Sequence, residues 1–491
     1  MSKYTQIDLT VDEKRQQRAV QRAKERNIVI PTIAEMKNPD LIDDGIKAQL
    51  KDVGLWDVNP LNLYRISWHN EPVEKGGGFG DVNYIELPEE LTGVKAKIVA
   101  ISGKWFPTGA HKVGAAFGCL VPRLVTGQFD PTTQKAVWPS TGNYCRGGAY
   151  DSSLLACDSI AILPEGMSKE RFEWLETVAG ETIKTPGTES NVKEIFDKCW
   201  ELRNSGQDLM IFNQFEEFGN YLWHYEVTGT AIERVLKQVM NEKSSFHGYI
   251  SCTGSAGTIA AGDYLKKIFP KSRIVASEAL QCPTIYNNGF GAHRIEGIGD
   301  KHIPWIHNVK NTDVAVAVDD EIAMQWVRMF NEEEGLKLLK EKGVKSDVID
   351  KLSWVGISGA ANIVAAIKYA KYFELKENDV LVTILTDSID MYESRLTELN
   401  QEHGKFDTFA AHEVSARYFD GINIDYIKEL NYYDRKAVHN LKYYTWVEQQ
   451  GKTYGEIVAQ WEDDSYWTDI TKHTVEIDEM IKAFNKKVAE A

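Results

Sequence analysis

The sequence lacks any apolar run of the roughly 18 to 20 residues that a membrane-spanning helix requires. Its first residues, MSKYTQIDLTVDEKRQQRAVQRAKER, also lack the apolar core of a secretory signal. We therefore expect a cytoplasmic protein that does not contact a membrane.

Cysteine is sparse and scattered. The chain contains neither a CxxC pair nor a dense cysteine framework. Such spacing is typical of reduced thiols in a cytoplasmic protein, so we expect neither disulfides nor a structural zinc site, and no metal is predicted. The six cysteines are Cys119, Cys145, Cys157, Cys199, Cys252 and Cys282.

Positive charge is also in deficit, with 56 Lys and Arg against 72 Asp and Glu and a net charge of -16. This balance argues against a nucleic-acid partner, because sequence-independent binding needs clustered cations to replace counterions. Neither the Walker phosphate motif nor the GxGxxG dinucleotide pattern is present. Their absence argues against a nucleotide-dependent kinase or dehydrogenase.

What is present is the alternation of short apolar runs with amphipathic helical stretches, from residue 95 to about 390. A chain of 491 residues exceeds one compact core, so at least two domains are expected. Alternation of this kind predicts an α/β fold with mainly parallel sheets covered by helices on both faces. The predicted strands are KIVAIS, AVWPS, SIAILP, TIKTP, LMIFNQ, GYISC, RIVASEA and VLVTILTD.

Both ends of the chain are predicted to be mainly helical. Residues 13–26 form a charged stretch that suits either a solvated helix or a subunit contact. The segment after about residue 400 is rich in aromatic residues. Because aromatic side chains need burial, we expect this segment to pack on the core or on a second subunit.

The first candidate site is a small-residue turn that ends in a lysine, Pro107-Thr108-Gly109-Ala110-His111-Lys112, followed by the apolar VGAAFGCLV. Burial and a helix N-terminus both disfavour the ammonium form of such a lysine. The neutral amine can then form an imine with an aldehyde. The alternative is a surface lysine at the start of a helix.

Two further loops follow predicted strands. Ser140-Thr141-Gly142-Asn143 offers hydroxyl, amide and backbone N–H groups to a substrate carboxylate, or simply caps a helix. The second loop is Gly254-Ser255-Ala256-Gly257-Thr258. Small residues before a helix favour a phosphate-binding turn there, with an ordinary tight turn as the alternative.

The last candidate is Thr386-Asp387-Ser388, at the end of a predicted strand. Because side chains alternate along a strand, only one of Asp387 and Ser388 can easily face a bound ring. A capping role for either residue is the alternative.

Together these motifs resemble the fold-type II pyridoxal-phosphate enzymes. TGAHK is similar to the lysine motif of the tryptophan synthase β-chain, whereas STGN and GSAGT resemble the substrate and phosphate loops of the cysteine synthases. In the same order, four other segments resemble that family: AILPEGMSKERFEWLETVAGETIKTPG, HRIEGIGDKHIP, VGISGAAN and ILTDSIDMY. The resemblance covers roughly residues 80 to 395.

The resemblance implies pyridoxal 5'-phosphate as cofactor and assigns roles to the motifs. Lys112 would hold the cofactor as a Schiff base and later remove the Cα proton. Asn143 would contact the 3'-oxygen of the cofactor, and Ser388 its pyridine nitrogen, which a neutral hydroxyl leaves largely unprotonated. Ser140, Thr141 and Gly142, together with Asn143, would hold the substrate carboxylate. The cofactor phosphate would lie against Gly254, Ser255, Ala256, Gly257 and Thr258.

The resemblance also implies an architecture. It suggests two open twisted sheets, with residues 81–130 and 246–400 forming a large cofactor-binding domain and residues 131–245 a smaller mobile domain. Residues 1–80 and 401–491 would be extensions. Dimers are usual in the family, so a homodimer is expected.

The implied reaction is β-replacement on an L-amino acid with a leaving group at Cβ, through an aminoacrylate. The alternatives are β-elimination by a lyase, ammonia-lyase or dehydratase, and a catalytically silent binding or regulatory subunit. The sequence departs from the family after Asn143, where Tyr144, Cys145 and Arg146 follow. Cys145 suits an acid/base thiol or a small buried residue, and Arg146 a second substrate carboxylate or a structural ion pair.

Overall fold

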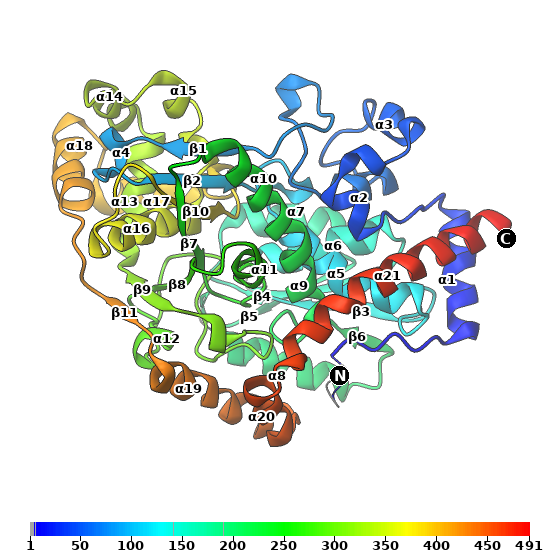
Figure 1. Ribbon diagram of the computed structural model, residues 1–491. Coiled ribbons are helices and arrows are strands. Elements are labelled where there is room, and N and C mark those ends of the chain that lie inside the picture. Colours follow the sequence, from blue (N-terminus) through cyan, green and yellow to red (C-terminus); the bar gives the residue numbers. More distant parts are fainter. Residues whose placement is uncertain (1–3, 5, 141, 190) are drawn as a thin grey trace.

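The computed structural model describes residues 4, 6–140, 142–189 and 191–491, and it contains two β-sheets (Figure 1). The larger sheet has the strand order β1-β2-β10-β7-β8-β9-β11 and the smaller has β5-β4-β3-β6. The strands are β1 (Tyr84–Leu87), β2 (Lys97–Ser102), β3 (Lys135–Pro139), β4 (Asp158–Pro164), β5 (Glu181–Thr185), β6 (Leu209–Ile211), β7 (Ser245–Cys252), β8 (Arg273–Ala279), β9 (Val314–Val318), β10 (Asp379–Leu385) and β11 (Ile427–Glu429).

Both sheets are mainly parallel. All strand pairs of the smaller sheet are parallel, and only the edge strands β1 and β11 of the larger sheet pair antiparallel. The inner strands are buried on both faces; every residue of β9, for example, is buried. This arrangement confirms the predicted α/β fold, because two-sided burial is what parallel strands covered by helices require.

The helices lie between the strands and at both ends of the chain (Figure 1). The α-helices are α1 (Glu13–Glu25), α2 (Ile33–Lys37), α3 (Asp44–Leu50), α4 (Glu89–Thr92), α5 (Lys112–Val125), α6 (Asn143–Leu154), α7 (Lys169–Val178), α8 (Val192–Arg203), α9 (Phe218–Trp223), α10 (Gly229–Val239), α11 (Ala260–Ile268), α12 (Thr284–Asn287), α13 (Asp320–Asn331), α14 (Glu333–Glu341), α15 (Ser346–Ile349), α16 (Ile357–Tyr372), α17 (Glu393–His403), α18 (Thr408–Ser415), α19 (Tyr432–Asn440), α20 (Tyr454–Glu462) and α21 (Ser465–Glu490). Among the described helices, none is both long enough and apolar enough to cross a membrane.

Helix α5 is held at the centre of the molecule by very close backbone contacts. A Cβ atom on Gly219 of α9 would lie 2.1 Å from the carbonyl oxygen of Gly118 in α5. A Cβ atom on Gly147 of α6 would lie 2.7 Å from the Cα atom of Val113. Since only glycine allows such approaches, these positions fix where the first turn of α5 lies relative to both neighbours.

Three strands were not among those predicted. Strand β1 is a short edge strand that precedes the first predicted run. The run VAVAV forms β9, although its apolar composition and length are typical of a buried strand. Strand β11 lies in the C-terminal segment that the sequence predicts to be helical, and it pairs with β9 at the sheet edge. The C-terminal segment is otherwise mainly helical, as expected.

The C-terminal segment packs on the rest of the same chain. Helix α21 contacts α1, α5 and α9, and Figure 1 shows α21 running toward α1 near the C-terminus. Trp446 and Phe484 are fully buried, and the Trp446 Nε1 group donates a hydrogen bond of 2.8 Å to the Ile303 carbonyl. The segment therefore packs on the core as predicted, although Tyr432, Tyr433, Tyr444 and Tyr454 remain exposed.

We predict that Phe484→Ala lowers the free energy of unfolding by about 3–5 kcal/mol, because it leaves a cavity under α21. Val475→Ala on the same helix is the control, since Val475 is 69% exposed. Urea unfolding followed by tryptophan fluorescence measures both variants. Equal midpoints for Phe484→Ala and Val475→Ala would show that α21 does not contribute to the core.

Candidate active site

Lys112 is buried at the start of α5, with its side-chain amine 3.1 Å from the Ser255 hydroxyl. Burial lowers the pKa of Lys112 to about 8, and the nearby Glu189 carboxylate only partly opposes this shift. A surface lysine at a helix start is therefore the wrong interpretation. The amine is substantially neutral at mildly alkaline pH, which is what a nucleophile or base requires.

Residues from three of the predicted motifs line one small cavity. Those residues are Lys112, Ser140, Asn143, Gly254 and Ser255. They come from the start of α5 and from the loops that follow β3 and β7, so they gather at the carboxyl ends of parallel strands, where ligands of α/β proteins bind. Gly142, Ala256, Gly257, Thr258 and Ser388 do not line the cavity. Thr141 lies outside the described residues.

The 254–258 turn is built tightly around the Ser255 hydroxyl. This oxygen accepts hydrogen bonds from Asn220 Nδ2 at 3.1 Å and from the Gly257 backbone N–H at 3.4 Å. A Cβ atom on Gly257 would lie 1.9 Å from Asn220 Oδ1, so no larger residue fits there. The turn leads into α11, and its conformation holds Ser255 toward the lysine.

The 140–143 loop connects the smaller sheet to the site. The Ser140 hydroxyl accepts hydrogen bonds of 3.2 Å from the Gly142 backbone N–H and from Gln214 Nε2. Asn143 begins α6, and its Nδ2 group donates a 2.7 Å hydrogen bond to Asp387. Asn143 Oδ1 is buried and has no hydrogen-bond partner among the described residues.

Of the two neighbouring polar residues after β10, Asp387 is the one in contact with Asn143. Its carboxylate also accepts a 2.6 Å hydrogen bond from the Tyr392 hydroxyl. Burial raises the pKa of Asp387, although Arg171, Tyr392 and Asn143 each favour the charged form. Ser388 is buried beside it. The role expected for Ser388 therefore stays a prediction.

Cys145 is a buried structural residue in this arrangement. Its thiol donates a 2.9 Å hydrogen bond to the Gly142 carbonyl, and burial raises the pKa of the thiol to about 12. A thiol that stays protonated to such a pH is a poor acid/base group at neutral pH. The interpretation as a small buried residue is favoured.

Sequence reasoning missed several residues that line the cavity. Gln214 follows β6, so its place at the carboxyl end of a parallel strand was a usable signal. Gly297 and Gly299 belong to the segment HRIEGIGDKHIP, whose resemblance to the family was noted without a role. Glu189 also lines the cavity, and no motif identified it.

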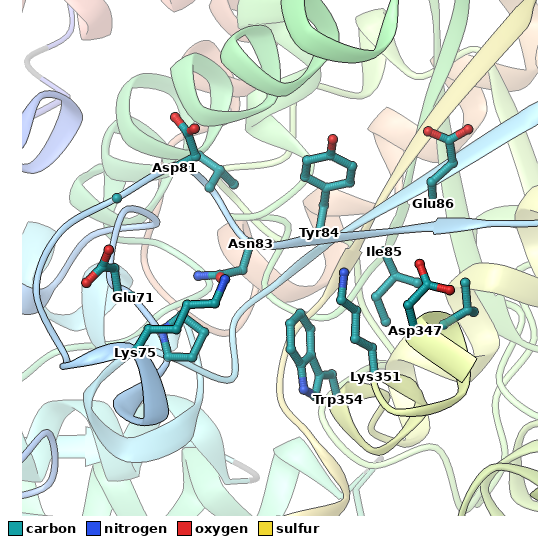
Figure 2. A pocket seen from close by; sticks show the side chains of 14 residues that line it. Glu71, Lys75, Asp81, Asn83, Tyr84, Ile85, Glu86, Asp347, Lys351 and Trp354 are labelled. Atoms are coloured by element: carbon teal, nitrogen blue, oxygen red, sulfur yellow. The ribbon is translucent and has the colours of Figure 1, made fainter. Parts of the chain in front are cut away.

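A much larger cavity, of about 510 Å³, lies elsewhere. It is formed by residues 71–86, which include edge strand β1, and by residues 347–354, which include part of α15 (Figure 2). Figure 2 shows Glu86 and Tyr84 on one side of it and Lys351 and Trp354 on the other. It contains none of the predicted site residues, so size alone does not locate the active site.

Comparison with known proteins gives consistent results. Residues 104–340 match the family described as "Pyridoxal-phosphate dependent enzyme". The chain is 30% identical over 287 residues to a Staphylococcus aureus cysteine synthase, covering 58% of this chain and 84% of that protein. It is 26% identical over 322 residues to the Saccharomyces cerevisiae cystathionine beta-synthase, covering 64% of this chain and 60% of that protein. The chain thus spans less than two thirds of the yeast protein.

Solved structures show the same fold. An O-acetylserine dependent cystathionine beta-synthase from Helicobacter pylori matches with a TM-score of 0.53 and 24% identity, covering 64% of this chain and 94% of that one. The Entamoeba histolytica O-acetyl serine sulfhydrylase isoform 3 matches with a TM-score of 0.54 and 19% identity, covering 68% and 92%. At 19–24% identity, these structures establish the fold of this chain and nothing about its reaction.

We predict that Lys112→Met makes the cofactor-free protein more stable at pH 7, by about 2–3 kcal/mol, because it removes a buried amine whose pKa is lowered. The wild type gains stability as pH rises from about 8 toward 10, since only the unfolded chain still binds that proton. The difference between the proteins should shrink over this range. Denaturant unfolding at several pH values measures it, and a constant difference would contradict the lowered pKa.

Proposed function

Because this chain belongs to the pyridoxal-phosphate-dependent enzyme family, we propose that it catalyses β-replacement on an L-amino acid with a leaving group at Cβ, using Lys112. The family identifies the chain as an enzyme and pyridoxal 5'-phosphate as its cofactor. The observation that carries the proposed site is the buried Lys112 amine, 3.1 Å from the hydroxyl of the 254–258 turn. The relatives named synthases support replacement as the reaction.

The donor set fits this cofactor. An amine whose pKa is lowered by burial, a glycine-rich turn before a helix and the NH2 group of Asn143 lie around one cavity. Lys112 would carry the aldehyde carbon, residues 254–258 would hold the phosphate, and Asn143 would contact the ring oxygen. The Lys112 amine now contacts Ser255, and this contact would be exchanged when the cofactor binds. The Asn143 NH2 group has a second N–H besides the one donated to Asp387, so it can contact the ring oxygen without losing that bond.

The bound cofactor supplies an electron-withdrawing ring that makes the Cα proton of an attached amino acid acidic. The protein supplies the rest. The Lys112 amine, kept partly neutral by burial, can take that proton. The first turn of α6 and the Ser140 hydroxyl would offer donors to the substrate carboxylate, and the part expected of Thr141 and Gly142 stays a prediction. Most residues that line the cavity are buried, and limited access of water favours capture of the reacting group by a nucleophile over hydrolysis.

β-Elimination to a keto acid is the second candidate, because the same residues serve both reactions. The two reactions differ only in what captures the intermediate. A catalytically silent binding subunit is disfavoured by the presence of Lys112, Asn143 and Ser388 together. We further propose a cytoplasmic homodimer. Every described cysteine is free, which is consistent with a reducing compartment.

We predict that Lys112→Ala abolishes the visible absorbance of the lysine-bound cofactor and the conversion of O-acetyl-L-serine with sulfide. The amine is lost while the rest of the cavity is kept. Lys193→Ala, on the exposed side of α8, is the control and should retain both. Absorbance spectra and thiol-product assays measure the outcome. An unchanged spectrum in Lys112→Ala would remove the assignment of this lysine.

A second prediction concerns Ser388. Replacing it by Asp places a carboxylate where the pyridine nitrogen is expected, which should protonate the ring and reduce the yield of replacement and elimination relative to transamination. Product ratios determined by chromatography test this. Ratios and rates equal to those of wild type would show that Ser388 does not contact the nitrogen.

A further inference from the structure

Arg146 is a fully buried arginine without an acidic partner. It lies in the first turn of α6, three residues after Asn143, and is 1% exposed. Its guanidinium lies 4.6 Å from the ring centre of Trp174 and 5.7 Å from that of Trp56. The only side-chain hydrogen bond it makes among the described residues is to the Met391 sulfur, and its Nε is buried without a partner.

Arg171, in the same region, is a buried arginine whose positive charge lies close to carboxylates. Its guanidinium lies 3.0 Å from the Glu296 carboxylate and 3.9 Å from that of Asp387. No described carboxylate comes within 4.0 Å of Arg146. The structural ion pair considered for Arg146 from the sequence is therefore not formed among the described residues. A buried charge without a counter-ion is costly, so the position demands an explanation.

The location of Arg146 connects it to the proposed site. The next residue, Gly147, lies against the backbone of Lys112 and Val113. Met391, which contacts the guanidinium, also lies against Gly109 in the lysine turn. Arg146 thus lies near the turn that carries the lysine and the residues that follow the 386–388 segment, and it comes three residues after Asn143 of the loop expected to hold the substrate carboxylate.

Trp56 and Trp174 separate this guanidinium from solvent. Trp56 is 38% exposed and also contacts Gly109, so its ring lies at the surface over the lysine turn. Aromatic rings stabilise a guanidinium without using its N–H groups for hydrogen bonds. The Nε group is left without a partner among the described residues and is available to an anion.

We propose that Arg146 binds a second anionic group, a carboxylate or a phosphate, that a substrate of the reaction carries in addition to its α-carboxylate. This inference rests on the proposed β-replacement. The planar guanidinium suits such a group because it can donate two parallel hydrogen bonds to a pair of oxygens. The anion belongs either to the leaving group of the amino acid or to the incoming nucleophile.

Matched substrate pairs distinguish these two sources. The donors are O-phospho-L-serine and O-acetyl-L-serine, each with sulfide; the nucleophiles are thioglycolate and 2-mercaptoethanol, each with O-acetyl-L-serine. In Arg146→Met holoenzyme we expect KM for the anionic member of one pair to rise about tenfold to a hundredfold. A rise of this size corresponds to the loss of a charge-assisted hydrogen bond. KM for the neutral member should stay within about threefold. For the anionic member, the KM of Arg146→Lys should lie between those of wild type and Arg146→Met.

The pair that responds identifies the source of the anion. If wild type converts neither anionic compound, or if Arg146→Met affects both members of each pair equally, the proposal is overturned. Arg328→Met is the matched control. Among the described residues, Arg328 is also buried without an acidic partner within 4.0 Å, but Asn400 Oδ1 and the Gly404 carbonyl each accept a 2.8 Å hydrogen bond from it, and none of the three lines the cavity. This control should leave all four KM ratios unchanged.

Thermal unfolding of the cofactor-free protein gives an independent readout. Arg146→Met should melt at or above the wild-type temperature, because it removes an uncompensated charge, whereas Arg328→Met should melt lower. Inorganic phosphate or succinate should raise the melting temperature of wild type more than that of Arg146→Met. A large drop in melting temperature for Arg146→Met, or equal protection of both proteins, contradicts the anion site.

The two readouts separate this inference from the proposed function. Absence of turnover with O-acetyl-L-serine and every thiol in wild type would reject β-replacement. Anion protection that disappears in Arg146→Met would still support the binding site in that case. If wild type turns over normally and Arg146→Met discriminates between the paired substrates as wild type does, only the role of Arg146 is rejected and β-replacement stands.

Discussion

A lysine amine acts as a nucleophile and base near neutral pH only where its surroundings withhold water from the ammonium form. In this chain that condition depends on the closeness of three helices. Gly118 and Gly219 bring the backbones of α5 and α9 together, and Gly147 brings α6 against the first turn of α5. Lys112 is only 8% exposed as a result. These contacts, which residues larger than glycine would prevent, fix the position of the amine. The chemistry of the site depends on that position.

Much of this arrangement could be predicted from the sequence, because its signals are local. Apolar runs between amphipathic stretches predict parallel strands, and the loops after those strands contain Ser140, Asn143 and Ser255, which the fold brings to one cavity. What could not be predicted depends on long-range packing. Whether Asp387 or Ser388 faces Asn143 is decided by the path of the chain after β10. Nothing in the pattern around Arg146 reveals that the nearby carboxylates contact Arg171 instead.

The C-terminal segment takes part in the site indirectly. Gly297 and Gly299 line the cavity, and the residues just after them are held by this segment. Lys442 donates hydrogen bonds to the carbonyls of Trp305 and His307, and Trp446 donates to that of Ile303. The wall of the cavity opposite Lys112 is thus supported by residues that come from more than a hundred positions later in the chain.

The pairing of the two ends of the chain has a consequence for biosynthesis. The buried face of α1, with Ala19 and Val20, packs against α21, and Asn485 and Lys487 of α21 hydrogen-bond to Ile30 and Gln16. Helix α21 leaves the ribosome long after α1. Until α21 is made, the buried face of α1 can be covered only in part, by α5, and a growing polypeptide with such an exposed apolar surface is a natural client for a chaperone.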